Sequence, residues 1–160
     1  MRFTVRDNQP GDFDVLWAID QSCFPPGIAY TRYELLTYMR RQGAFTLVAE
    51  SGDNGKPHPI LGFLVAETSR RGLGHIITID VRESARRHQV GSTLLTAAEE
   101  RLHNAKSRAV QLETAVDNRS ALSFYKRHGY DVVKVIPHYY SNGVDALLLE
   151  KNLLSAKSPS

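Results

Sequence analysis

The sequence predicts an α/β fold in which one mixed β-sheet is flanked by helices on both faces. Segments rich in β-branched and apolar residues, typical of strands, alternate with segments whose apolar residues recur at helical spacing. Their predicted order is one strand, two helices, three strands, a helix, a strand, a helix and two strands. With 42% hydrophobic residues among 160, the chain is long enough to bury a core between these layers.

The first half of the chain is predicted to contain a strand, two helices and two further strands. Four apolar residues of the first helix fall near one face: Phe13, Leu16, Trp17 and Ile19. Pro25 is expected to end this helix, because proline cannot continue it. The turn-rich residues 51–58 predict a hairpin between the two strands. The five elements are expected at residues 2–6, 9–24, 31–41, 44–50 and 59–68.

The second half is predicted to contain four strands and two helices. The last helix has Asp117 or Asn118 as its N-cap and Gly129 at its end. The elements are expected at residues 71–81, about 89–104, 109–116, 117–129, 130–140 and 145–153, with a turn at 141–143 inside the closing hairpin. We expect one domain over residues 1–152 and a loose tail at 153–160.

Composition excludes several classes of protein. The net charge of +3 and pI near 9.1 permit contact with phosphate groups but are too small to indicate nucleic-acid binding. No apolar run approaches the roughly 20 residues of a membrane span, and the first residues lack the apolar middle of a signal peptide. Cys23 is the single cysteine, and neither Cys-x-x-Cys nor His-Glu-x-x-His occurs. We therefore expect a cytoplasmic protein with no metal site, no nucleic-acid partner and no membrane contact.

The basic turn at residues 82–89 is the first candidate for a binding site. It leads from a predicted strand into a helix N-terminus, where unpaired backbone N–H groups and the positive end of the helix dipole attract anions. A solvated turn with no ligand is one interpretation. A P-loop and a dinucleotide fingerprint are excluded, because neither glycine pattern is present. The remaining interpretation is a looser cradle, in which N–H groups and arginines hold a diphosphate.

Two motifs in this sequence resemble the GNAT superfamily of N-acetyltransferases. The stretch from Arg86 to Gly91 is similar to the family's acyl-coenzyme A signature, with Gln89 in place of the middle glycine. Residues 118–130, "NRSALSFYKRHGY", are similar to the second signature. The resemblance covers about residues 2–151 and implies a mostly antiparallel sheet of about seven strands with about four helices. It also implies acetyl-CoA as the cosubstrate.

The resemblance implies a coenzyme site between two splayed strands, the one ending at Val81 and the one carrying Leu112. Backbone groups of Ile79 and Val81 would bind the pantetheine arm as an added strand does, and one of them would polarise the thioester carbonyl. The expected coenzyme-binding residues are Ile79, Val81, Arg86, Arg87, His88, Gln89, Val90, Gly91, Ser92, Asn118, Ser120 and Tyr125.

Tyr125 and Glu113 are the expected catalytic residues. Tyr125 matches the family tyrosine beside the coenzyme sulfur, where a phenol is able to protonate the departing thiolate; a role as a core aromatic is the alternative. Phe124 is expected to take the buried direction. Glu113 is a carboxylate on an otherwise apolar strand and is the first choice for general base. His75 is the second choice, and a surface role is the alternative for both.

The closing hairpin resembles that of the N-terminal acetyltransferases, including the bacterial ribosomal-protein N-alpha-acetyltransferases. The resemblance implies a peptide slot between this hairpin and the loop after the first helix, so the expected acceptor is the α-amine of a protein. The expected substrate-binding residues are Phe24, Pro25, His75, Asp80, Tyr139 and Tyr140. A small-molecule amine or lysine acetyltransferase and a noncatalytic acyl-CoA-binding module remain open, as does the choice between monomer and homodimer.

Overall fold

The computed structural model describes residues 1–52, 59–69 and 71–154. Residues 53–58 of the predicted turn at 51–58, and residues 155–160 of the predicted tail at 153–160, lie outside the described residues. Within them, the helices are α1 (Phe13–Cys23), α2 (Arg32–Arg40), α3 (Val90–Asn104) and α4 (Arg119–Arg127), with a short 3-10 helix η1 (Glu83–Ala85). The strands are β1 (Phe3–Asp7), β2 (Ala44–Ser51), β3 (Ile60–Thr68), β4 (Leu73–Val81), β5 (Ala109–Ala115), β6 (Asp131–Ile136) and β7 (Ala146–Asn152).

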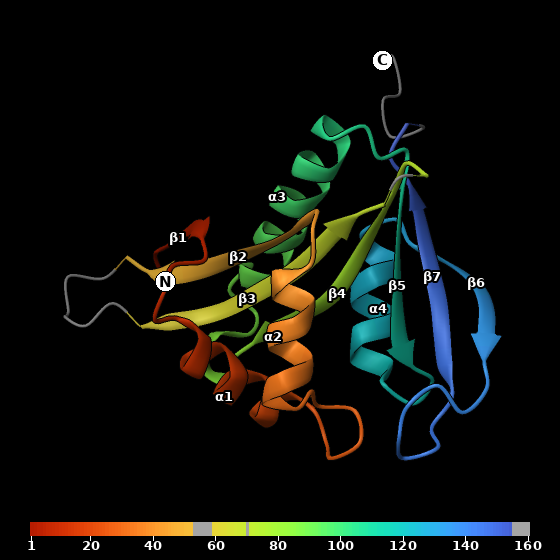
Figure 1. The fold of residues 1–160 in the computed structure, drawn as a ribbon, viewed down its shortest axis with the longest axis horizontal. Helices are drawn as coiled ribbons and strands as arrows, with labels where there is room; N and C mark the ends of the chain where they lie inside the picture. Colours follow the sequence, from red (N-terminus) through yellow and green to blue (C-terminus); the bar gives the residue numbers. More distant parts are fainter. Residues whose placement is uncertain (53–58, 70, 155–160) are drawn as a thin grey trace.

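The strands form one seven-stranded sheet in the order β1-β2-β3-β4-β5-β7-β6. Every neighbouring pair is antiparallel except β4 and β5, which are parallel. The predicted α/β class, with a mixed and mostly antiparallel sheet, is therefore confirmed (Figure 1). No helix among the described residues is long and apolar enough to cross a membrane.

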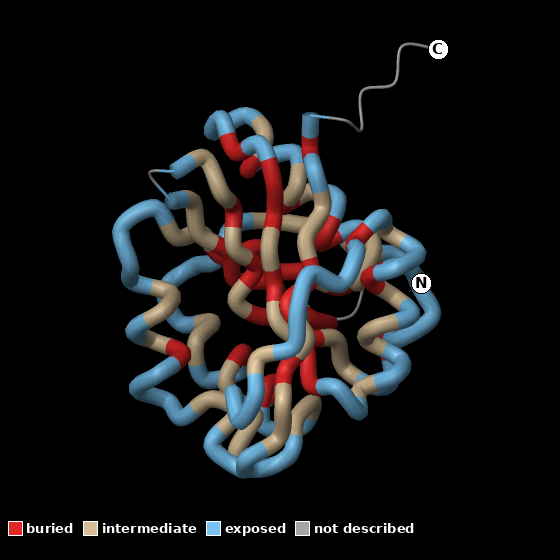
Figure 2. The backbone as a smooth tube through the Cα atoms, turned by 90° about the vertical axis from the view of Figure 1, so that its right-hand side faces the viewer, coloured by how far each residue is buried: buried red, intermediate tan, exposed pale blue. Residues whose placement is uncertain are grey.

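Helices cover both faces of the sheet, and each face has its own group of buried apolar side chains. On one face, α3 contributes Leu94, Leu95 and Leu102, which pack with β-strand and α4 residues. On the other face, Leu16 and Ile19 of α1 pack with α2 and with β2 and β3. The buried segments run through the centre of the molecule, beneath an exposed surface (Figure 2).

Local sequence signals explain where the shorter helices begin and end. Thr31 caps α2: its hydroxyl accepts the N–H of Glu34, and the Glu34 carboxylate accepts the N–H of Thr31 in return. Asn118, one of the two predicted candidates, caps α4 by accepting the N–H of Ala121 at 3.2 Å. Gly129 follows the end of α4 at a φ of 92°, a conformation that favours glycine.

Strand β4 contains the irregularity that opens the sheet. Ile76 pairs with Ala66 and Thr78 with Val65, so Ile77 is an extra residue in a β-bulge. Just before this point, pairing between β4 and β5 stops after three residue pairs, the last of which joins His75 to Gln111. Beyond it the two strands diverge (Figure 1). The bulge thus coincides with the point where a gap opens in the sheet.

Candidate active site

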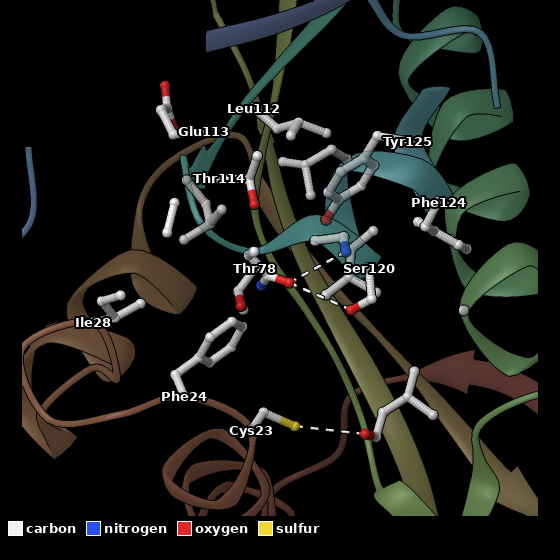
Figure 3. A pocket seen from close by; sticks show the side chains of 18 of the residues that line it. Cys23, Phe24, Ile28, Thr78, Leu112, Glu113, Thr114, Ser120, Phe124 and Tyr125 are labelled. Carbon is white, nitrogen blue, oxygen red and sulfur yellow. Dashed lines mark hydrogen bonds between the residues drawn. The ribbon is translucent and has the colours of Figure 1, made fainter. Parts of the chain in front are cut away.

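A pocket of about 690 Å³ lies in the gap between β4 and β5. Its walls come from both strands, the turn before α3, the start of α4, the α1–α2 loop and the β6–β7 loop (Figure 3). Most of the predicted site residues line it: Phe24, Pro25, Ile79, Val81, Arg86, Arg87, Gln89, Val90, Gly91, Ser92, Glu113, Asn118, Ser120, Tyr125, Tyr139 and Tyr140. Three predicted residues are not part of this lining: His75, Asp80 and His88.

The turn before α3 has the backbone of an anion cradle. Arg87 and Gln89 both have a φ of 67°, and Gln89 has a ψ of 14°, the left-handed conformation. Left-handed residues in a turn direct successive N–H groups toward one point, and the helix N-terminus adds its unpaired N–H groups. Gln89 adopts this conformation without the freedom of the glycine that the motif usually has there. Arg86 is held in place by a 3.1 Å bond from its Nε to the Val81 carbonyl.

Gly91 leaves little room beside this turn. A Cβ atom at this position would lie 3.4 Å from Phe124 Cζ and 3.7 Å from Val81 Cγ2, which is ordinary contact. An alanine would therefore fit the empty pocket, whereas a larger side chain would push against Phe124.

Tyr125 is the more buried of the two aromatic residues on α4, so the expectation that Phe124 takes the buried direction is wrong. Tyr125 is 9% exposed and packs edge-on against Phe124 and Tyr130. Phe124 instead packs at the edge of the core, next to Gly91. Burial, followed by the charges of Asp80 and Tyr140, raises the pKa of Tyr125 above that of a free phenol. The hydroxyl is therefore kept protonated, as a proton donor requires.

Glu113 projects from β5 at the other end of the pocket, where it meets His75 of β4. The His75 Nε2 and Glu113 Oε1 atoms are 2.8 Å apart, and only 17% of the Glu113 side chain is exposed. The His75 Nδ1 atom lies 3.7 Å from Glu67, whose carboxylate accepts a bond from Arg41 at 3.2 Å. Strand order explains this cluster, because β3, β4 and β5 are neighbours in the sheet.

The pKa of His75 reflects opposing effects. Burial of the ring is the largest effect and lowers the pKa, but the hydrogen bond and charge of Glu113 and the charge of Glu67 raise it, and the net change is upward. Burial and the nearby Glu113 also raise the pKa of Tyr139, to about 12. His75 does not itself line the pocket, but it is bonded to the pocket residue Glu113.

Two loops meet on the far side of Glu113 from the turn before α3. The Ser141 hydroxyl donates to the Gly27 carbonyl at 3.0 Å, which joins the β6–β7 loop to the α1–α2 loop. Tyr139 and Tyr140 stack edge-on, with ring centroids 4.9 Å apart, and both line the pocket. Apolar side chains with hydroxyl groups thus surround this end of the cavity, a composition suited to a peptide backbone.

Four residues near the site were missed by sequence reasoning: Asp20, Tyr30, Glu67 and Thr78. Tyr30 and Thr78 line the pocket. Asp20 lies below it, fully buried against Asp80. A signal for Asp20 existed, because a carboxylate four residues after Leu16 and next to Ile19 interrupts the apolar face of the first helix.

A thioester coenzyme would fit this arrangement, because the gap has the form to take an extended arm and the turn at its end has the backbone of an anion site. The class of protein is therefore an acyl-coenzyme A-dependent transferase. Comparison with known sequences agrees: the model of the Acetyltransferase (GNAT) family matches residues 13–130, and the chain belongs to this family. As a member, it is an acetyl-CoA-dependent N-acetyltransferase.

Three similar proteins match this chain over nearly its whole length. An N-alpha-acetyltransferase of Sulfurisphaera tokodaii is 42% identical over 161 residues, which cover 92% of this chain and 91% of that protein. The crystal structure of Ard1 from Thermoplasma volcanium superposes with a TM-score of 0.84 and 26% identity, covering 95% of this chain and 98% of the other. The NatC complex bound to Gag peptide and CoA contains a chain with a TM-score of 0.80 and 23% identity, covering 95% and 99%.

Proposed function

We propose that this protein acetylates the N-terminal α-amine of proteins. The observation that carries the proposal is the position of the Glu113–His75 pair, at the end of the coenzyme gap where the α1–α2 and β6–β7 loops meet. An amine that enters between these loops reaches the carboxylate. The similarity to relatives named N-alpha-acetyltransferase supports this acceptor.

The coenzyme would bind along the gap. In this proposal, N–H groups of residues 87–92 hold the diphosphate, Arg86 and Arg87 add positive charge, and Ile79 and Val81 bind the pantetheine arm. The turn places both arginines, Gln89 and Gly91 along the pocket. Asn118 and Ser120, at the start of α4, line the gap opposite β4.

Glu113 is the proposed general base. It accepts a proton from the substrate ammonium, directly or through one water, and the neutral amine then attacks the thioester carbonyl. Glu113 is preferred over His75 because it lines the pocket and His75 does not. His75 then serves as the partner that orients the carboxylate.

Tyr125 is the proposed general acid. When the tetrahedral intermediate collapses, the carbon–sulfur bond breaks and the phenol donates its proton to the thiolate of the departing coenzyme. Its raised pKa keeps that proton in place until the thiolate forms. The attacking nitrogen loses its extra proton as the amide forms, and an equivalent proton restores the Tyr125 phenol. The products are the acetylated amine and free coenzyme A, and the proton on Glu113 returns to solvent.

A single catalytic domain over residues 1–152, acting in the cytoplasm, is part of the proposal. One continuous sheet from β1 to β7 supports the first point, since β7 ends at Asn152 and pairs with both β5 and β6. The α1–α2 loop, the β6–β7 loop and the turn before α3 all lie within this range.

Mass spectrometry tests the acceptor. The protein is incubated with acetyl-CoA and either short peptides with free N-termini, the same peptides with blocked N-termini and a free lysine, or polyamines. We expect acetylation of the α-amine in the first set and little in the others. Acetylation confined to lysine or to polyamines would overturn the proposed acceptor while leaving the coenzyme site intact.

A further inference from the structure

Two carboxylic side chains meet beneath the floor of the pocket. Asp20 of α1 is 0% exposed and Asp80 of β4 is 1% exposed. One oxygen of each is bonded: the Thr78 hydroxyl donates to Asp80 Oδ1 at 2.5 Å, and the Tyr30 N–H donates to Asp20 Oδ2 at 2.8 Å. The other two oxygens, Asp20 Oδ1 and Asp80 Oδ2, are buried with no donor among the described residues.

Among the described residues, no cationic side chain is bonded to either carboxyl group. None of the salt bridges among the described residues involves either aspartate. The titratable groups that face them are Cys23 at the end of α1, Tyr30 in the α1–α2 loop and Tyr125 on α4. Two carboxylates in contact, out of water, cannot both remain ionised, whereas one proton held between them satisfies both orphan oxygens.

The electrostatics of Asp80 agree with this geometry. Its burial, followed by the hydrogen bond and charge of Asp20, holds the pKa of Asp80 well above its usual range. The bond from Thr78 opposes this change, and Cys23 adds to it. Burial and the neighbouring Asp20 thus both favour the protonated form of Asp80.

The pair is linked to the α1–α2 loop, which forms one wall of the proposed acceptor site. Asp20 holds the N–H of Tyr30, a pocket residue whose carbonyl accepts bonds from Trp17 at 3.0 Å and Gln21 at 2.7 Å. The Tyr30 hydroxyl donates to the carbonyl of Ile77, the extra residue of the β4 bulge, at 3.3 Å. The position of residues 24–30 relative to β4 therefore depends on α1 being held to β4 at this level.

We propose that Asp20 and Asp80 share one proton and, in that form, act as positioning residues that hold the acceptor-side loop, residues 24–30, against strand β4. Asp80 lies between Ile79 and Val81, the two residues proposed to bind the coenzyme arm, but its side chain points to the opposite face. The pair thus joins the acceptor wall to the strand that carries the thioester. The positioning role rests on the proposed function, whereas the shared proton does not.

Stability as a function of pH tests the shared proton without any substrate. Asp80→Asn keeps a donor for Asp20 but does not titrate. In the unfolded chain Asp80 loses its proton near pH 4, whereas the folded chain retains it, so the unmodified protein must lose stability relative to Asp80→Asn as pH rises above about 4. The ratio of their unfolding constants should change up to tenfold per pH unit. A ratio that does not change with pH would overturn the shared proton.

A matched control separates this effect from general changes in charge. Asp14→Asn alters an exposed aspartate on the same helix, 79% of whose side chain is accessible to solvent. Its stability relative to the unmodified protein should not follow the trend of Asp80→Asn at neutral and alkaline pH. The same trend in both variants would also overturn the proposal.

Kinetics and calorimetry test the positioning role. Asp80→Ala leaves Asp20 without its partner, so the KM for the peptide acceptor should rise about tenfold while the Kd for coenzyme A changes little. Asp80→Asn should restore most of the peptide KM. Equal loss in both variants, or weaker coenzyme binding with unchanged peptide KM, would overturn the positioning role. If Asp80→Ala does not fold, Asp80→Asn decides alone: its peptide KM must stay near that of the unmodified protein.

Discussion

The side chains of His75 and Glu113 form a 2.8 Å bond across the two central strands, next to the last pair of residues that those strands share. His75 still pairs with Gln111 through the backbone, whereas Glu113 lies two residues farther along β5, where pairing has ended. A side-chain bond therefore spans the opening of the coenzyme gap. This position brings the proposed base to the entrance of the gap from the acceptor side.

Replacing Glu113 tests its role as the base. Glu113→Gln should lower kcat/KM for peptide acceptors about a hundred-fold or more at neutral pH. The loss should shrink above about pH 8, where the α-amine deprotonates without help. A pH–rate profile of both proteins measures this. Glu150→Gln, on neighbouring β7, serves as the control and should keep full activity; a Glu113→Gln loss that is constant with pH would point to a structural role.

His75 should make stability dependent on pH. Its pKa is raised in the folded protein, so its contribution to the free energy of unfolding is fully present below the unfolded value of about 6.5 and is lost as pH rises through the folded value. His75→Asn should remove this decline. Melting temperatures between pH 5 and pH 9 measure it, and a decline of the same size in both proteins would exclude His75 as its cause.

Tyr125→Phe separates chemistry from binding. The ring remains, so packing against Phe124 and Tyr130 should survive, but the thiolate loses its proton donor. We expect kcat to fall about a hundred-fold or more, with little change in the Kd for coenzyme A measured by calorimetry. Full turnover in this variant would leave Tyr125 with a packing role alone.

Gln89 should be a strained position that glycine relieves. A residue with a side chain costs about 1 kcal/mol in the left-handed conformation, and the greater freedom of glycine in the unfolded chain offsets part of this. Gln89→Gly should therefore raise the melting temperature slightly and preserve coenzyme affinity. Arg87→Gly, at the same φ of 67°, is the matched comparison: it should gain stability but lose coenzyme affinity, because a positive charge is removed. Equal affinities would show that Arg87 does not contact the phosphates.

Gly91 tests the path of the diphosphate. Gly91→Ala should leave folding intact, because the new Cβ meets Phe124 at 3.4 Å. Gly91→Val should weaken coenzyme A binding about tenfold by crowding Phe124 and the turn. Calorimetry measures the affinity, with melting temperature as the control for folding. Unchanged affinity for the valine variant would place the diphosphate elsewhere.

The order of elements was predictable because each strand and helix has its own periodicity, cap or breaker. Thr31, Asn118 and Gly129 act locally, so their effects are visible in the sequence. The orientation of α4 was not predictable from the sequence. Phe124 and Tyr125 are adjacent, and only the packing of α3 and β5 against the helix decides which of the two side chains is buried.

The residues of the proposed site were partly predictable for a similar reason. The proposed coenzyme-binding turn is continuous in the sequence, and all of its predicted residues from Arg86 to Ser92 except His88 line the pocket. The contact between Asp20 and Asp80 joins positions 60 residues apart, and the Glu67–His75–Glu113 cluster depends on the order of three strands. Such contacts depend on which strands and helices become neighbours in the fold. The spacing of apolar residues along the sequence does not specify this.

The short pairing of β4 with β5 also affects how the molecule holds together. Three residue pairs join a four-stranded part of the sheet, β1 to β4, to a three-stranded part, β5 to β7. At the open end these two parts face each other across the pocket rather than through backbone bonds. A coenzyme that bonds to both walls would therefore complete the sheet as a missing strand does. The bound protein should exchange its β5 and β7 amide hydrogens more slowly than the free protein, so that the cosubstrate acts as a part of the fold.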